Sequence, residues 1–168
     1  GDGTFDVVYN VVVQNTGADT LSNVVVQDSP NGNLSDATIA VVADVSLSGN
    51  TAATAPSIGN YNSGTLASIA SLAAGEGFTL QYTLRLQPAN AADPTNISNQ
   101  VTVNAVDSAG NPISDLSDAG NQVVGDNGVG GDDDPTVFTT AAVFVDKTLF
   151  ASVDNGDGTF DLTYRVLV

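Results

Sequence analysis

Apolar and aromatic side chains recur at every second residue in two stretches of this chain. Near the start they occupy the positions Phe5, Val7, Tyr9, Val11 and Val13. In the middle they occupy the positions Phe78, Leu80, Tyr82, Leu84 and Leu86. Because successive side chains of a β-strand point to opposite faces, each stretch predicts a strand with one face in a core and the other toward solvent.

Further strands are indicated by apolar runs that turn-forming residues separate. The pattern predicts strands at residues 21–28, 37–48, 65–69 and 97–106. Between them, residues 50–63 and 88–94 are rich in small, polar and turn-forming residues and are expected to be loops. Few stretches have helical periodicity. Many short strands with turns at this spacing predict an all-β protein, an antiparallel β-sandwich.

The start of the chain is repeated near its end. Residues 1–6 read GDGTFD and return as residues 156–161, and 9 of the first 13 positions match at an offset of 155. The matches beyond this motif pair Tyr9, Val11 and Val13 with Tyr164, Val166 and Val168. A fixed long period indicates an array of like modules. We therefore expect a tandem repeat and interpret the chain as a segment of a longer polypeptide.

The repeat also predicts the domain organisation. We expect residues 1–135 to form one module and residues 136–168 to form the first two strands of the next. Residues 110–135, where Gly, Asn and Asp dominate, predict an acidic loop or linker. An apolar segment precedes the second GDGTFD motif but not the first, so the first module is expected to lack its own first strand. A neighbouring copy would supply this inter-module strand, along one chain or by strand donation, through its equivalents of Val143, Val145, Lys147 and Leu149.

Composition narrows the range of functions. The chain carries 3 Lys and Arg residues against 19 Asp and Glu residues, a net charge of −16, with no Cys and no His. This composition excludes a disulfide scaffold and thiol chemistry, and it removes the commonest general base. The negative charge repels nucleic acid and anionic membranes, and no apolar run is long enough to span a bilayer. We expect no nucleic-acid partner, no membrane insertion in this segment and no enzymatic activity.

Acidic clusters near the end of the chain are candidate metal sites. Ca²⁺ prefers about six to eight oxygen ligands, and clustered Asp and Asn residues supply such oxygens. The candidate ligands are Asp126, Asn127, Asp132, Asp133, Asp134, Asp154 and Asp157. None of the clusters has the spacing of an EF-hand. Because Asp and Asn also favour tight turns, the sequence leaves both calcium binding and turn formation open.

Lys147 is the only lysine of the chain. One interpretation is that it protects an edge strand against aggregation. The other is an isopeptide bond to an Asn or Asp beside an acid, which some surface sandwiches form. Because the sequence shows no diagnostic partner for such a bond, it favours the first interpretation.

The order of short motifs resembles that of a known repeat family. VDKT at residues 145–148 precedes a GDGTFD motif, and after the first GDGTFD motif come a tyrosine-containing strand, QNTG, LSNVVVQD and LAAGE. This order resembles the DUF11-type conserved repeat of large bacterial and archaeal surface proteins. The resemblance implies an immunoglobulin-like sandwich, a secreted or cell-surface location and no catalytic residues.

These observations lead to one hypothesis on function and two alternatives. The leading hypothesis is a structural module of an extracellular tandem-repeat array, a surface filament or adhesin stalk. The first alternative is a ligand-binding adhesin domain that recognises glycan or protein. For that role only Tyr61 is expected to be exposed, because Tyr9 and Tyr82 fall on apolar faces and predict core packing. The second alternative is an accessory domain of a secreted enzyme.

Overall fold

The computed structural model describes residues 3–28, 34, 37–89, 96–118, 136–139, 146–154, 156 and 159–167. Regular secondary structure within these residues is β-strand, apart from one turn of 3-10 helix at Tyr61–Ser63. All the strand pairs among them are antiparallel. The prediction of an all-β protein built from antiparallel sheets is therefore confirmed.

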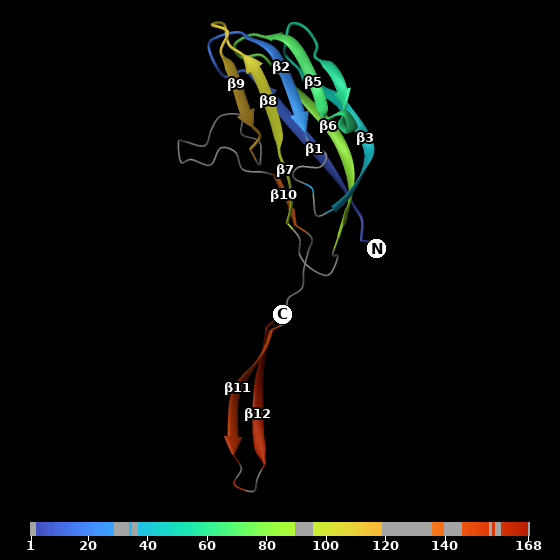
Figure 1. Ribbon diagram of the computed structural model, residues 1–168. Helices are drawn as coiled ribbons and strands as arrows, with labels where there is room; N and C mark the ends of the chain where they lie inside the picture. Colours follow the sequence, from blue (N-terminus) through green and yellow to red (C-terminus); the bar gives the residue numbers. More distant parts are fainter. Residues whose placement is uncertain are drawn as a thin grey trace.

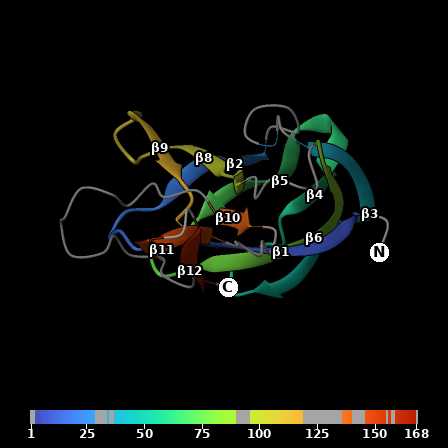
Figure 2. The same cartoon turned by 90° about the horizontal axis from the view of Figure 1, so that it is seen from below.

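Two sheets face each other across the core. The three-stranded sheet has the order β1-β6-β3, with the bounds β1 (Phe5–Gln14), β6 (Gly77–Pro88) and β3 (Ala37–Asn50). The five-stranded sheet has the order β4-β5-β2-β8-β9, with the bounds β4 (Ser57–Asn60), β5 (Thr65–Leu72), β2 (Leu21–Asp28), β8 (Val101–Val106) and β9 (Pro112–Leu116). Figures 1 and 2 show the two layers from the side and from below.

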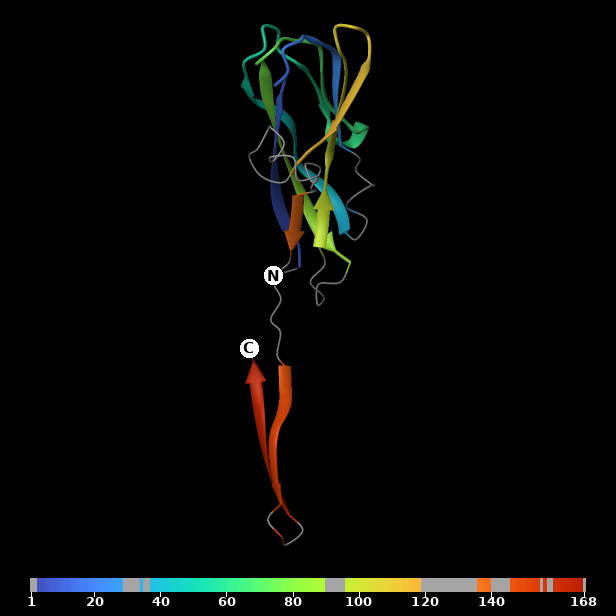
Figure 3. The same cartoon turned by 90° about the vertical axis from the view of Figure 1, so that its left-hand side faces the viewer.

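Two smaller strand pairs complete the described structure. β7 (Asn96–Asn99) pairs with β10 (Thr136–Thr139), so the strand predicted at residues 97–106 is divided at Gln100. β11 (Asp146–Asp154) pairs with β12 (Phe160–Leu167). This hairpin is drawn apart from the two sheets in Figures 1 and 3. β12 contains the second copy of the sequence that forms β1.

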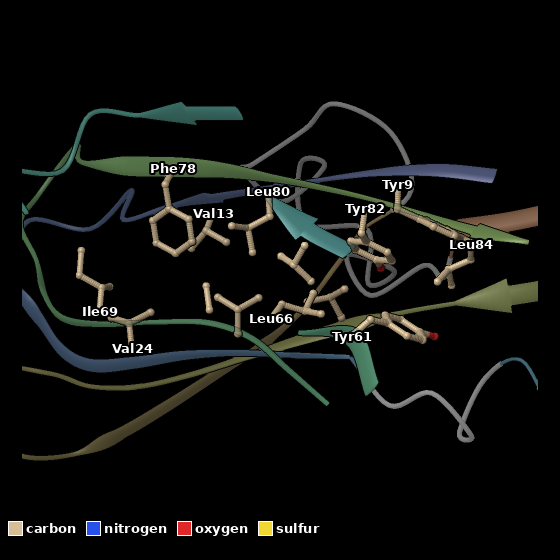
Figure 4. Close-up of a cluster of buried hydrophobic side chains, with 14 of the residues drawn as sticks. Tyr9, Val13, Val24, Tyr61, Leu66, Ile69, Phe78, Leu80, Tyr82 and Leu84 are labelled. Carbon is tan, nitrogen blue, oxygen red and sulfur yellow. The ribbon is translucent and has the colours of Figure 1, made fainter. Parts of the chain in front are cut away.

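β6 is the centre of the three-stranded sheet and of the core. Its inward series is at most 3% exposed at each position and consists of Phe78, Leu80, Tyr82, Leu84 and Leu86. On β1 the odd-numbered face is also inward, since Tyr9 and Val13 are each 7% exposed, although Phe5 at the strand end is 38% exposed. Val24, Leu66 and Ile69 meet this layer from the other sheet (Figure 4). Burying each such leucine or valine contributes roughly 1.5–3 kcal/mol to folding.

The segment at residues 50–63, expected to be a loop, contains β4 and the 3-10 turn. β4 pairs with β5 at the edge of the five-stranded sheet, and all four of its residues are exposed. A strand without an inward face has no alternation for a sequence pattern to detect. The turn after it is closed at both ends, because the Asn60 side chain accepts from the Ser63 N–H and Gly64 adopts the left-handed conformation (φ 74°).

β3 begins where the sequence predicts, but its alternation fails in the second half. Three register shifts against β6 interrupt the pairing, and the apolar side chain of Leu47 is 37% exposed. Asp44 lies in the shifted stretch. Its Oδ1 accepts hydrogen bonds from the Val45 N–H at 2.8 Å and the Tyr61 N–H at 2.9 Å. The irregularity of β3 thereby fixes the turn that carries Tyr61.

Part of the segment at residues 110–135, expected to be an acidic loop or linker, forms β9. The connection from β8 to β9 is a tight turn in which Asp107 Oδ1 accepts from the Ala109 and Asn111 N–H groups at 2.9 and 2.7 Å. Four of the five residues of β9 are exposed, so its apolar signal is weak. Beyond it, residues 136–139, assigned to the next repeat, form β10 and pair with β7 of the first module.

Candidate functional site

One edge of β1 has no partner strand among the described residues. The hydrogen bonds of Asn15 show which backbone groups point toward β6. Its N–H donates to the Glu76 carbonyl at 2.9 Å, and its carbonyl accepts from the Gly75 N–H. In an antiparallel strand, alternate residues direct both backbone groups to the same edge. The odd-numbered residues of β1 therefore bond to β6. The backbone groups at the open edge belong to the even-numbered residues, among them Val8, Asn10 and Val12.

A cavity of about 670 Å³ opens along this edge, and we call it the β1 cleft. One wall is β1 from Tyr9 to Gln14, and the facing wall is formed by β8 and β9 of the other sheet. Asn99 and Asp118 add polar side chains to the lining. The cleft thus lies where the three-stranded sheet ends and the five-stranded sheet continues. A further strand beside β1 would cover it.

A cluster of polar side chains is buried beside the β1 cleft. Asp28 and Asn99 are 1% and 3% exposed. Tyr82 Oη donates to Asp28 Oδ2 at 2.6 Å, and Asn99 Nδ2 lies 2.9 Å from the same carboxylate oxygen and 3.1 Å from Tyr82 Oη. The carboxylate therefore fixes the Asn99 amide against the tyrosine hydroxyl. We call Asp28, Asn99 and Tyr82 the buried triad.

Tyrosine rings pack around the buried triad. The Tyr82 ring stacks on Tyr9 with a centroid distance of 5.2 Å, and it lies 5.3 Å from the tilted ring of Tyr61 (Figure 4). Such pairs contribute about 0.5–1.5 kcal/mol beyond the area that they bury. Tyr61 is only 1% exposed, so the expectation that it is exposed is wrong. The hydrogen bond from its N–H to Asp44 holds the 3-10 turn in the orientation that directs this ring inward.

The same environment changes the acidity of the three phenols. Burial, together with the negative charge of Asp28, raises the pKa of Tyr9 from 10.0 to about 12. Burial and Asp28 also raise the pKa of Tyr61 and of Tyr82, and for Tyr82 the hydrogen bond to Asp28 adds to the effect. All three hydroxyls therefore stay protonated over the physiological range. They can donate hydrogen bonds, but they do not supply a base.

Four buried oxygens in this region have no hydrogen-bond partner among the residues that the structure describes: Tyr9 Oη, Tyr61 Oη, Asn99 Oδ1 and Asp118 Oδ1. A buried polar atom without a partner costs roughly 1–3 kcal/mol. Tyr9, Asn99 and Asp118 also line the β1 cleft. A polar group that entered the cleft would thus meet acceptors that the described residues leave unsatisfied.

The residues predicted for calcium binding are not brought together in the described structure. Asp154 is the last residue of β11, and the other six candidates lie outside the described residues. Among the side chains that are described, no group of three or more acidic residues is placed to hold a metal ion. Calcium binding at the predicted clusters remains a prediction.

The residues predicted for the inter-module strand lie in or beside β11. Val143 and Val145 are outside the described residues. Lys147 and Leu149 belong to β11, where they pair with Val166 and Tyr164 of β12.

The buried triad is not predicted from the sequence, although the strand pattern contains a signal for it. Asp28 continues the inward series of Val24 and Val26 on β2, and Asn99 lies in phase with Ile97 and Val101. A polar residue in an inward phase is a useful indication, because burial without hydrogen bonds is costly. The partners themselves come from strands distant in sequence, which no local pattern reveals.

Comparison of this chain with protein-family models, with curated proteins and with solved structures gives no match. Among the described residues, no helix is long and apolar enough to cross a membrane. The features of this chain that bear on its function are the β1 cleft, the buried triad and the sequence repeat.

The hydroxyl groups of Tyr61 and Tyr82, whose rings pack against each other, should differ in their contribution to stability. Tyr82→Phe removes the hydrogen bond to Asp28 and should lower the free energy of unfolding by roughly 1.5–3 kcal/mol. Tyr61→Phe removes a hydroxyl that has no partner among the described residues, so it should leave stability unchanged within about 0.5 kcal/mol or raise it. Urea denaturation of both variants measures the difference. Equal losses would contradict the assigned hydrogen bond.

Stability should fall at alkaline pH because the native phenols are weaker acids than the unfolded ones. Above pH 10.0 the unfolded chain releases tyrosine protons that the native state retains, so the free energy of unfolding decreases as pH rises toward about 12. Below pH 10.0 the contribution of the tyrosines to the free energy of unfolding is fully present. Urea denaturation at several pH values tests this, and Tyr9→Phe should show a shallower decline. A free energy of unfolding that is constant between pH 10 and pH 12 would contradict it.

Proposed function

We propose that this chain is a non-catalytic structural module of an extracellular tandem-repeat array. Its first strand is a copy of β11 that lies in the β1 cleft, supplied by the preceding repeat or by another chain. One observation carries the proposal. β11 pairs with β12, which is the repeat equivalent of β1, while one edge of β1 beside the cavity has no partner strand among the described residues. The sequence thus encodes a partner strand for the edge that lacks one.

The residue pairing between β11 and β12 predicts how a copy of β11 would pair with β1. Leu149 pairs with Tyr164, which corresponds to Tyr9 at the offset of 155, and Lys147 pairs with Val166, which corresponds to Val11. Directly paired residues of an antiparallel ladder project to the same face. Because the face of Tyr9 is the core face of β1, a docked copy of Leu149 would fill the apolar part of the cleft.

Docking of this strand would complete the sandwich in two ways. The backbone groups of Val8, Asn10 and Val12 would gain partners, and this would close an edge that otherwise invites aggregation. The three-stranded sheet would gain a fourth strand opposite β9 and cover the cleft. Strand addition of this kind gives affinity through the main chain and specificity through alternate side chains.

The wider context supports an extended extracellular array. Equivalent positions lie 155 residues apart, so each module leads into the next along the sequence. A net charge of −16 makes neighbouring modules repel one another rather than collapse. The motif order that resembles the DUF11-type repeat supports an immunoglobulin-like sandwich and a cell-surface location.

Polypeptides with increasing numbers of repeats should lengthen in proportion to repeat number. If modules join end to end, the maximum dimension from small-angle X-ray scattering rises by the same increment for each added repeat. Raising the salt concentration tests how far charge repulsion maintains this extension. A dimension that grows only as in a compact globule would contradict the array and favour an adhesin domain.

A peptide of residues 143–154 should bind the full chain at the open edge of β1. Hydrogen exchange should then slow at the amides of Val8, Asn10 and Val12, because these N–H groups gain partners, whereas Tyr9 and Val11 already bond to β6. A Leu149→Asp peptide should lose this protection, since it places a charge on the core face. Thr148→Asp is the matched control, with the same charge on the opposite face. Protection that is absent, or equal for both peptide variants, would contradict docking.

A further inference from the structure

The side-chain carboxamide of Asn99 is placed where a nucleophile that enters the β1 cleft could attack its Cγ atom. Its side chain lines the cleft, and its amide nitrogen is held by Asp28 Oδ2 at 2.9 Å and Tyr82 Oη at 3.1 Å. Its Oδ1 is buried and has no hydrogen-bond partner in the described part of the chain. The amide is thus fixed beside a carboxylate that is 1% exposed, with its carbonyl oxygen unsatisfied.

The strand proposed for the cleft carries the only lysine of the chain. In the register of β11 on β12, Lys147 corresponds to a position paired with Val11, and Val11 packs against the core and lines the cleft. A lysine at this position lies on the inward face of the docked strand. Val11 is two residues from Tyr9, about 7 Å along the strand, and Tyr9 stacks on the tyrosine of the buried triad. The flexible four-carbon stem of lysine suits this span.

We propose that the docked lysine forms an isopeptide bond with Asn99, and that Asp28 carries the protons. The inference rests on the docking of a β11 copy in the β1 cleft. The lysine Nζ attacks Asn99 Cγ, the new bond joins Nζ to Cγ, and the bond from Cγ to Nδ2 breaks. The neutral amine and the carboxamide yield a secondary amide and ammonia, so the step needs no oxidant, reductant or other co-reactant.

The surroundings assign a role to each member of the buried triad. A lysine amine enclosed by apolar side chains loses its proton more readily than in water, which makes it nucleophilic. Asp28 accepts the proton that the lysine loses. From its position 2.9 Å from Asn99 Nδ2, it returns a proton to the departing nitrogen. The Tyr82 hydroxyl holds this carboxylate at 2.6 Å and acts as a positioning residue.

The register decides between the two interpretations of the lysine that the sequence allows. A lysine that protects an edge strand against aggregation should project outward, in phase with the exposed residues of β1. The pairing with the equivalent of Val11 places it in the inward phase instead. The structure also supplies what the sequence pattern lacked, an asparagine and an acid side by side in the core.

Intact mass spectrometry of the full chain incubated with the peptide of residues 143–154 tests the cross-link. The expected product has the summed mass of chain and peptide less one ammonia, and fragmentation places the bond between Lys147 of the peptide and Asn99 of the chain. With Asn99→Asp, a cross-linked product should lose water in place of ammonia. Asn99→Ala should give no covalent product.

Further variants separate the cross-link from the docking on which it depends. A Lys147→Arg peptide keeps the charge and should protect the β1 amides as the natural peptide does, without forming a covalent product. Asp28→Asn should reduce the rate of cross-linking at least tenfold while amide protection by the peptide persists, which also shows that this variant folds. Protection by the natural peptide with no change of mass would overturn the cross-link and leave the docking intact. Absence of both protection and mass change would overturn both proposals.

Discussion

The open edge of β1 is the constraint on which the rest of the structure depends. A three-stranded sheet faces a five-stranded one, so the two layers are unequal in width. On the side of β1 the smaller sheet ends first and leaves the β1 cleft between it and β8 and β9. Within the described part of the chain, the backbone groups of Val8, Asn10 and Val12 without a partner strand and half-covered apolar side chains therefore occur at the same place. One added strand of the kind proposed would satisfy both, and β11, which pairs with the repeat equivalent of β1, is such a strand.

β6 shows how the fold tolerates this open side. It bonds to β1 on one edge and β3 on the other, and its inward residues are almost fully buried from Phe78 to Leu86. The centre of the sandwich is therefore complete without the additional strand. Tyr9 and Val11 are the residues whose environment the strand would change, because they lie between the complete core and the cleft.

The sequence predicts those parts of the fold in which one face of a strand is buried and the other exposed. β2 and β6 satisfy this condition and agree with the pattern, and β1 departs from it only at Phe5. β4 and β9 are exposed along most of their length, so they carry little periodic signal and were expected to be loops. In β3 the register shifts break the alternation at Val41 and beyond. The buried triad depends on Asp28, Tyr82 and Asn99 meeting from three strands, which is a property of the tertiary fold.

The cost of the buried triad is an argument for its use. A carboxylate and a carboxamide in a sandwich core give less stability than apolar side chains of similar size. Atoms such as Asn99 Oδ1, which has no partner among the described residues, add to the cost. A purely structural core has no need of this arrangement beside the β1 cleft. In an array, tension along the chain acts on the strand that links each module to its neighbour. Hydrogen bonds alone let such a strand dissociate, whereas an amide bond from its lysine to Asn99 would hold it permanently. The polar core and the single lysine then have one common explanation.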